Sequence, residues 1–374
     1  MVIYLIVFAA SVCIIHCTET YKMQKRVKIF FVVLALLLPS LLAGLRSYEI
    51  GSDTSGYGIY WFNQATQFKN WLSFIKYAKG YSIDYGYATL NYLASRLGSD
   101  AHIFFFVLCF FEVGILYYVA KYNCQKGAVA LSFIVYFFLY YNDSMNNMRQ
   151  FPAALIILYS YKFIKEKKLF QFLVCVILAM QFHVTAILAV VLYPISWLAK
   201  NKFSKLHLLL ITIGVLVANL SLEFIFKLLG TFGFNMARYE HYINSTEGGG
   251  KYIRLILFGV IWVFYLINRD NYRKIKKDDA DVFLFYSTIS LAFTTSMFLG
   301  LSNFIIRISY YFDFFVMIYL PSIVEMHKTI TIKDGSVRVS VNFIVIMALI
   351  LLYWIITYVI RNGAETVPYK FFWN

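Results

Sequence analysis

Long apolar runs separated by short polar stretches dominate the chain, and this pattern predicts a bundle of membrane helices. A membrane-spanning helix needs about 20 consecutive apolar residues. Twelve apolar segments are present, some of them short for a full span, so we expect an all-α, polytopic integral membrane protein with about 12 transmembrane or re-entrant helices. They cover approximately residues 2–17, 27–45, 101–120, 128–141, 150–164, 169–183, 185–199, 206–229, 252–268, 281–301, 304–324 and 340–360.

The apolar stretch 169–199 is interrupted by Gln181 and His183. Two interpretations are open: two short helices that break near His183, or one long tilted helix. A helix that breaks inside a membrane must be surrounded by protein or line a water-filled cavity. A break at this position would therefore mark an internal site.

The composition agrees with a membrane protein. Of 374 residues, 61% are hydrophobic and only 14% are charged, whereas an average soluble domain is about 45–50% apolar and about 25% charged. The excess apolar surface must face lipid. The net charge of +15 raises the question of a nucleic-acid partner.

The distribution of that charge answers the question. If the N-terminus lies outside, most of the 34 Lys and Arg residues fall in short cytoplasmic loops, beginning with Lys22, Lys25, Arg26 and Lys28. This is the positive-inside pattern of a multi-pass protein. It predicts that both termini lie outside, and it gives no support for nucleic-acid binding. Because the first basic residues follow the first apolar segment, that segment is predicted to be a retained helix.

One membrane domain, residues 1–374, is the simplest organisation, with two long outer loops at 46–100 and 230–251. The first loop is rich in Trp, Tyr and Phe, which predicts amphipathic helices lying on the outer surface. Aromatic rings also stack on sugar faces, which is a second interpretation. The five cysteines and the acidic residues show no metal-site spacing, so neither a metal nor a cofactor is expected.

Single arginines mark the outer ends of several helices, where the positive-inside rule disfavours them. Snorkelling or internal ion pairs could account for any one of them. For the set, a shared anionic ligand such as a phosphate is favoured, because a guanidinium binds phosphate in a bidentate manner. These residues are Arg46, Arg149, Arg254 and Arg307, with Arg238 in the second long loop.

Arg149 precedes a predicted helix in which Pro152 suits the first turn and Asn146 or Asn147 could act as the cap. The free N–H groups at the start of that helix, together with Arg149, would form a binding site for a phosphate or diphosphate. Tyr310 and Tyr311 follow Arg307 at helical spacing, on its face.

Two residues are candidates for a general base. His183 interrupts an apolar run and is predicted to lie level with Arg149, where it could act near neutral pH. Asp53 follows Gly51 in a predicted turn, and could instead orient Arg46 or bind a sugar hydroxyl. Glu112 and Asp313 are expected at membrane depth, and the sequence names no partner for either.

Together these residues resemble the EpsG family of Wzy-like polysaccharide polymerases. The resemblance covers most of the chain in the right order, with one departure at Thr185, where a serine is expected. It rests on Arg46, Gly51-x-Asp53-Thr54 and Tyr57, on Arg149-Gln150 with Ala153 and Ala154, on Phe182-His183-x-Thr185-Ala186, and on Arg307-x-x-Tyr310.

The resemblance implies a glycosyltransferase of the bacterial cytoplasmic membrane with a GT-C-like helical fold, which joins undecaprenyl-diphosphate-linked oligosaccharide repeat units on the outer face. The product would be an exopolysaccharide, capsule or O-antigen. The substrate-binding residues would be Arg46, Arg149, Gln150, Arg238, Arg307, Tyr310 and Tyr311, and the catalytic candidates His183 and Asp53. Membrane lipid, a chain-length regulator and a flippase are the expected partners.

Three other functions remain open. An outer-face glycan ligase would use the same arginines with a different acceptor. A membrane acyltransferase would place its histidine toward the cytoplasm, which the charge pattern disfavours. A transporter or flippase of lipid-linked sugar would show charged residues along a path through the membrane and, often, internal repeats. The sequence has only Glu112 and Asp313 at membrane depth and no evident repeat.

Overall fold

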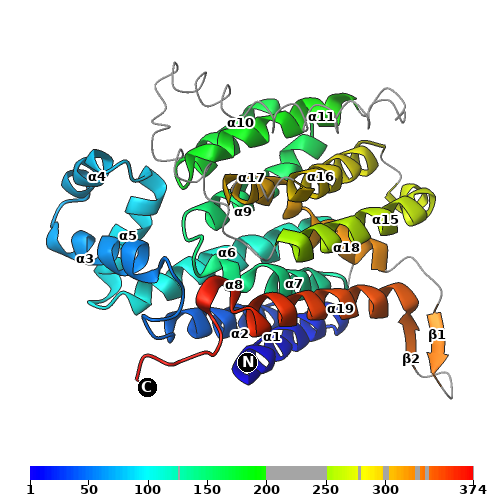
Figure 1. Cartoon of the computed structure of the whole chain (residues 1–374), viewed down its shortest axis with the longest axis horizontal. Coiled ribbons are helices and arrows are strands. Elements are labelled where there is room, and N and C mark those ends of the chain that lie inside the picture. Colours follow the sequence, from blue (N-terminus) through cyan, green and yellow to red (C-terminus); the bar gives the residue numbers. More distant parts are fainter. Residues whose placement is uncertain are drawn as a thin grey trace. The chain divides into compact units, whose positions relative to one another are not determined.

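The computed structural model describes residues 1–124, 127–198, 251–276, 279–297, 303–324, 329–332 and 337–373. These residues are almost entirely helical, as the apolar pattern predicts (Figure 1). The exception to the all-α expectation is a short antiparallel hairpin in which β1 (Thr329–Ile332) pairs with β2 (Val337–Ser340).

The chain divides into two compact units. The first comprises Met1–Lys162, Phe170–Ile187 and Met317–Asn374, and the second comprises Phe163–Leu169 and Leu188–Val316. A single membrane domain stays the prediction for the chain as a whole.

The first unit contains most of the long apolar helices. Its elements are α1 (Val2–Thr20), α2 (Lys25–Gly44), a π-helical segment (Thr54–Ile59), α3 (Tyr60–Gln67), α4 (Trp71–Gly80), α5 (Tyr85–Leu97), α6 (His102–Asn123), α7 (Val129–Leu139), α8 (Tyr141–Ser144), most of α9 (Gln150–Lys165), most of α10 (Leu169–Met180), most of α18 (Val316–Val324), the hairpin, α19 (Val341–Trp354) and a second π-helical segment (Ile355–Ile360).

The second unit contains α11 (Leu192–Leu198), α15 (Lys251–Lys276), α16 (Asp279–Met297) and α17 (Asn303–Asp313). Here α16 packs against α11, α15 and α17. Predicted segment 206–229 and the second long loop, 230–251, lie outside the described residues apart from Lys251.

Four helical segments of the described part are long and apolar enough to cross a membrane: α1, α2, α6 and Phe343–Ile360. Other predicted segments are shorter apolar helices, among them α7 and α10. Of the two interpretations of residues 169–199, the structure shows the break near His183, because α10 ends at Met180 and a 3-10 helix begins at Val184. The segments support a membrane protein, and the number of twelve spans stays a prediction.

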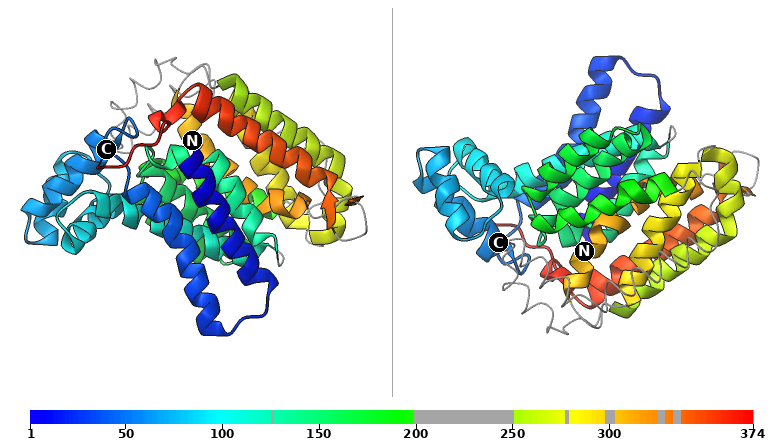
Figure 2. Two further views of the ribbon diagram at one scale, coloured as in Figure 1. Left: turned by 90° about the horizontal axis from the view of Figure 1, so that it is seen from below. Right: turned by 90° about the horizontal axis from the view of Figure 1, so that it is seen from above.

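Helices α1 and α2 form a hairpin (Figure 2). Its hydrogen bonds satisfy polar groups inside the apolar helices. Pro39 lies within α2 and has no N–H to donate to the carbonyl of Ala35, one turn earlier. The Ser11 hydroxyl on α1 donates to that carbonyl at 2.8 Å instead. The Tyr141 hydroxyl donates to the carbonyl of Pro39 at 2.6 Å.

A charged cluster ties the opposite ends of the same helices together. The side chain of Glu19, only 1% exposed, pairs with Lys28 at 3.2 Å and with Lys121. The Tyr117 hydroxyl also donates to this carboxylate, at 3.4 Å. The cluster joins the end of α1, the start of α2 and the end of α6, which the charge pattern predicts to be their cytoplasmic ends.

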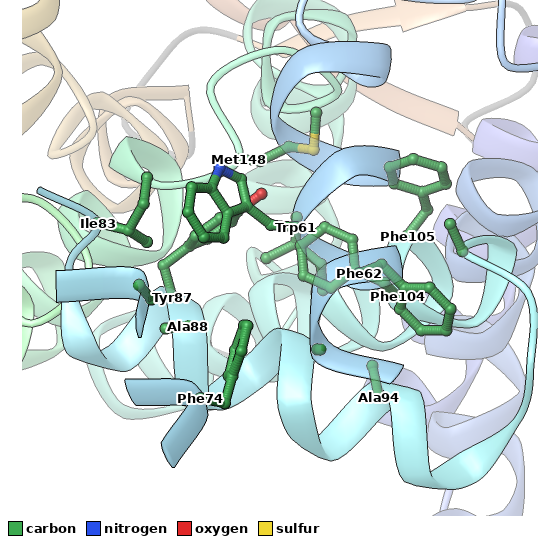
Figure 3. Close-up of a cluster of buried hydrophobic side chains, with 14 of the residues drawn as sticks. Trp61, Phe62, Phe74, Ile83, Tyr87, Ala88, Ala94, Phe104, Phe105 and Met148 are labelled. Atoms are coloured by element: carbon green, nitrogen blue, oxygen red, sulfur yellow. The ribbon is translucent and has the colours of Figure 1, made fainter. Parts of the chain in front are cut away.

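The aromatic loop 46–100 forms helices, as predicted, and many of its rings pack into a core of their own (Figure 3). Phe62, Phe74 and Tyr87 are fully buried, whereas Trp71 and Tyr81 remain exposed. Phe104 and Phe105 of α6 extend the same core. The aromatic content of this loop therefore serves packing first, and helices α3, α4 and α5 form a solid cap on the first unit.

This core leaves no room for a side chain at Gly58. A Cβ there would lie 2.3 Å from the Phe105 ring, whereas a Cβ at Gly56, two residues earlier, would meet nothing within 4 Å. We therefore predict that Gly58→Ala lowers the free energy of unfolding by about 1–3 kcal/mol through overpacking. Thermal unfolding of the purified protein in detergent, with Gly56→Ala as the matched control, measures the effect; equal stability of the two variants would refute the packing shown here.

Candidate functional site

Segments that are far apart in the sequence meet at one end of the first unit. The Gly51 N–H donates to the carbonyl of Glu365 at 3.0 Å, and the Gly86 N–H donates to the carbonyl of Gln181 at 2.6 Å. The Asp53 N–H donates to Oδ1 of Asn146 at 3.5 Å. The loop after α2, the start of α5, the turn before α9, the end of α10 and the C-terminal tail therefore form one cluster, which we call the candidate site.

Arg149 lies in this cluster, immediately before α9. Its Nη1 pairs with Oδ2 of Asp84 at 3.4 Å, and its guanidinium lies 4.5 Å from the centre of the Tyr57 ring. The side chains of Arg149 and Asp84 are 13% and 12% exposed, so the pair lies at the edge of the buried region. A carboxylate on one side and a ring face on the other hold the guanidinium in a defined orientation.

Asp84 is not among the site residues that the sequence predicts, and Tyr57 belongs only to the motifs that carry the family resemblance. Asp84 precedes α5 and is 65 residues away from Arg149 in the chain. Tyr57 is itself held, because its carbonyl accepts a 3.0 Å hydrogen bond from the Tyr87 hydroxyl. Burial raises the pKa of the Tyr87 phenol, so the hydroxyl stays protonated and able to donate.

Asp53 is half-buried in the loop after α2. This loop contains Gly51 in the left-handed region, with φ of 91°. A Cβ on Gly51 would also lie 2.5 Å from Oδ1 of Asn146, so both backbone conformation and space require glycine here. The predicted turn is present, and it presents Asp53 beside Asn146 and in the same cluster as Arg149.

Asn146 contacts the loop and the tail through its side chain. Its Oδ1 faces the Asp53 N–H, and its Nδ2 donates to the carbonyl of Ala364 at 2.8 Å. Helix α9 begins at Gln150 with Pro152 in its first turn, as predicted. The side chain of Asn147 donates to the carbonyl of Asp143 at 3.1 Å. Both asparagines thus order the turn that precedes the helix.

Arg46 is almost fully buried, at 2% exposed. Its Nη2 donates to Oγ1 of Thr54 at 3.3 Å and to the carbonyl of Met145 at 3.2 Å, and its guanidinium lies 4.2 Å from the centre of the Phe105 ring. Arg46 thus fastens the Asp53 loop to the turn that leads to Arg149. Binding of a diphosphate by Arg46 itself stays a prediction.

His183 lies just after the break that ends α10 and is 4% exposed. Its Nδ1 and Oγ1 of Thr185 are 2.6 Å apart. Gln181, two residues earlier, accepts hydrogen bonds from Gly86 and Tyr87. His183 therefore follows closely on a residue that contacts the start of α5, Thr185 orients its ring, and its role in the site stays a prediction. Gln150 is buried in the first turn of α9, at 2% exposed.

The C-terminal tail is part of the candidate site, which the sequence did not indicate. An isolated bridge pairs Arg46 with Phe371, and the Asn142 side chain donates to Oγ1 of Thr366 at 2.7 Å. Ala364 and Glu365, whose carbonyls bind Asn146 and Gly51, have φ of 69° and 53°. Such left-handed conformations are strained for residues other than glycine.

A salt bridge links the C-terminal tail to the loop after α2. Nζ of Lys370 lies 2.6 Å from Oε2 of Glu49, and this ammonium lowers the pKa of the Glu49 carboxyl. Near the N-terminus of the described chain, the Tyr4 hydroxyl donates to the carbonyl of Thr366 at 2.8 Å. The first residues of α1 and the tail therefore lie at the same end of the first unit.

The remaining predicted residues lie elsewhere. Arg307, Tyr310 and Tyr311 belong to α17 of the second unit; both tyrosines are buried and Arg307 is partly exposed. Arg238 lies outside the described residues.

Arg254 and Asp313, also in the second unit, form a buried ion pair, and the Arg254 guanidinium also donates to Oγ of Ser309 at 2.9 Å. Arg254 is therefore the partner of Asp313, which the sequence alone did not indicate. The pair also supports, for Arg254, the interpretation as an internal ion pair.

The arrangement has definite chemical uses. An oriented guanidinium at the edge of a buried region can bind an anionic oxygen, and a carboxylate and an imidazole in the same cluster can accept a proton. The helices place this cluster where apolar segments end. These features define a class: a helical membrane protein with a polar site at the ends of its helices.

The family follows from comparison with known proteins. The model of the EpsG family matches residues 28–371. The chain therefore belongs to the EpsG family, which the sequence motifs had suggested. No curated protein and no solved structure matches the chain.

The convergence of segments at one end of the first unit predicts the result of cysteine labelling. In a background without the native cysteines, Ser52→Cys and Arg361→Cys should react with a membrane-impermeant maleimide from the same side of the membrane. Lys22→Cys should react from the opposite side, because the Glu19 cluster lies at the other end of α1. Labelling of Ser52→Cys and Arg361→Cys from opposite sides would contradict the structure. All three positions are exposed.

Proposed function

We propose that the chain is a polysaccharide polymerase that joins undecaprenyl-diphosphate-linked oligosaccharide repeat units on the outer face of the bacterial cytoplasmic membrane. Membership of the EpsG family supports polymerisation, and the apolar helices support a membrane location. The observation that carries the proposal is Arg149, held by Asp84 and Tyr57 in a cluster that also contains Asp53 and His183.

The proposed orientation places the candidate site and both termini outside, in a multi-pass, GT-C-like membrane fold. It follows from the charge pattern, in which lysines gather near the Glu19 end of the first unit. The same labelled positions test this orientation, because an impermeant reagent added to intact cells would reach Ser52→Cys directly.

In the proposed reaction, a hydroxyl of one repeat unit attacks the anomeric carbon of the growing chain. The bond from that carbon to the diphosphate oxygen breaks, and the electron pair leaves with undecaprenyl diphosphate. Arg149 stabilises the negative charge that develops on the leaving group. A base accepts the proton of the attacking hydroxyl.

His183 is our first choice as that base and Asp53 the second. In the tautomer that we propose, Nδ1–H of His183 donates to Oγ1 of Thr185, which leaves a lone pair on Nε2 to accept the proton. Thr185 thus holds the ring in the reactive tautomer.

Arg307, with Tyr310 and Tyr311, is a second candidate for phosphate binding, as is Arg238. Gln150, at the start of α9, is a candidate contact for the sugar or the phosphate. Each of these roles is tested by its own substitution in the assay below.

Purified protein incubated with a lipid-diphosphate-linked repeat unit should give a ladder of products. We predict that Arg149→Lys slows ladder formation by about 10²-fold, because an ammonium cannot reproduce the two-donor geometry of a guanidinium. Asp84→Asn should slow it by about tenfold, since Arg149 loses its orienting charge. Arg96→Lys, on the exposed end of α5, is the matched control.

The pattern of products decides between the competing functions. A ligase would give a single transferred product, and a transporter would leave the repeat unit unchanged. Wild-type rates for Arg149→Lys in a protein that does form ladders would remove Arg149 from the site while polymerisation stands.

For the base, we predict that His183→Ala slows the reaction by about 10²–10⁴-fold. Thr185→Val should slow it less, and Thr185→Ser should keep most activity because it keeps the hydroxyl. Initial rates are compared at equal amounts of folded protein. If Asp53→Asn abolishes the reaction while His183→Ala does not, Asp53 is the base; if both variants polymerise at the wild-type rate, neither is.

A further inference from the structure

A narrow cavity lies inside the first unit, between the end of α2, helix α6 and the turn before α9. It has room for about one water molecule. Of the described residues that line it, two carry charge, Arg46 and Glu112. Apart from Ser144, the other lining residues are hydrophobic, and they include Met145 and Met148.

Glu112 brings a carboxylate into the middle of α6, one of the long apolar helices. It is 1% exposed, and its Oε2 accepts a 2.9 Å hydrogen bond from the Tyr136 hydroxyl. Its Oε1 is buried and has no hydrogen-bond partner among the described residues. A buried charged oxygen without a partner is strongly unfavourable.

Arg46 presents the complementary atom. Its Nη2 is used by Thr54 and Met145, whereas its Nε is buried and has no partner in the described part of the chain. Nε carries one N–H, which is a donor only. Donor and acceptor thus belong to two side chains that line the same cavity.

We propose that one bound water bridges Nε of Arg46 and Oε1 of Glu112, and that Glu112 is the counter-charge of Arg46. The water accepts from the guanidinium N–H and donates to the carboxylate oxygen, which satisfies both atoms. A cation would be repelled by Arg46 and an anion by Glu112. A neutral molecule that both donates and accepts fits the pair, and water is of the right size.

This assignment gives Glu112 a function that is independent of the proposed reaction. Arg46 fastens the Asp53 loop to the turn before Arg149, and it does so in apolar surroundings. The negative charge of Glu112 offsets the desolvation of that guanidinium. In this proposal, a buried carboxylate matches the charge of Arg46, just as Asp84 matches the charge of Arg149 at the edge of the buried region.

A double-mutant cycle on thermal stability tests the counter-charge. Glu112→Gln should lower the midpoint of unfolding of the wild-type protein by roughly 5–10 °C, because it leaves Arg46 as an uncompensated buried charge. In an Arg46→Met background, the same Glu112→Gln change should lower the midpoint by about 2 °C or less, or raise it. An equal loss in both backgrounds would refute the pairing.

Glu19→Gln provides the matched control. Glu19 is also buried and also contacts α6, but its partners are Lys28 and Lys121. Its effect on the midpoint should be the same with and without Arg46→Met, since the two sites share no partner. The comparison separates a specific charge pairing from a general response to losing a buried carboxylate.

X-ray radiolysis tests the water itself, because hydroxyl radicals formed from a bound water oxidise the side chains next to it. Met145 and Met148, 2% and 1% exposed, should be oxidised at least severalfold faster than Met317, which is 0% exposed and does not line the cavity. Radicals generated chemically in bulk solvent should oxidise all three equally slowly. Equal rates under radiolysis would exclude the water, even if the double-mutant cycle shows coupling.

Discussion

A backbone amide that leaves a helix inside an apolar bundle must find another partner, because no bulk water reaches it. In the first unit, the segments that leave helices satisfy one another. The tail accepts the Gly51 N–H through Glu365, and the end of α10 accepts the Gly86 N–H through Gln181. This mutual satisfaction brings together segments from along the whole unit. The candidate site is the place where those exchanged hydrogen bonds concentrate.

The same constraint explains how the charged side chains are arranged. Arg254 and Asp313 neutralise each other within the second unit, and Glu19 pairs with two lysines at one end of the first. These acidic side chains are at most 1% exposed. Arg149 differs in being 13% exposed, at the edge of the buried region. Depth therefore separates Arg254, which holds the fold together, from Arg149, which we propose as a ligand-binding arginine.

Much of the fold could be predicted from local pattern. The apolar runs, the break after Met180 and Pro152 in the first turn of α9 all depend on neighbouring residues. The partners could not be predicted, because Asp84 and Asp313 lie 65 and 59 residues from the arginines that they bind. The packing of the aromatic loop could not be predicted either, because the same Trp, Tyr and Phe residues suit helices on a membrane surface and a small hydrophobic core. Only the three-dimensional arrangement decides between them.

The long separation between partners also affects how the protein assembles. Glu49 and Lys370, which pair at the rim of the candidate site, are 321 residues apart. The loop after α2 thus enters the membrane long before the tail that completes its hydrogen bonds has been synthesised. Until then its amides and Asn146 must be satisfied by water or other temporary partners. Biogenesis therefore delays completion of the candidate site until the tail has been synthesised.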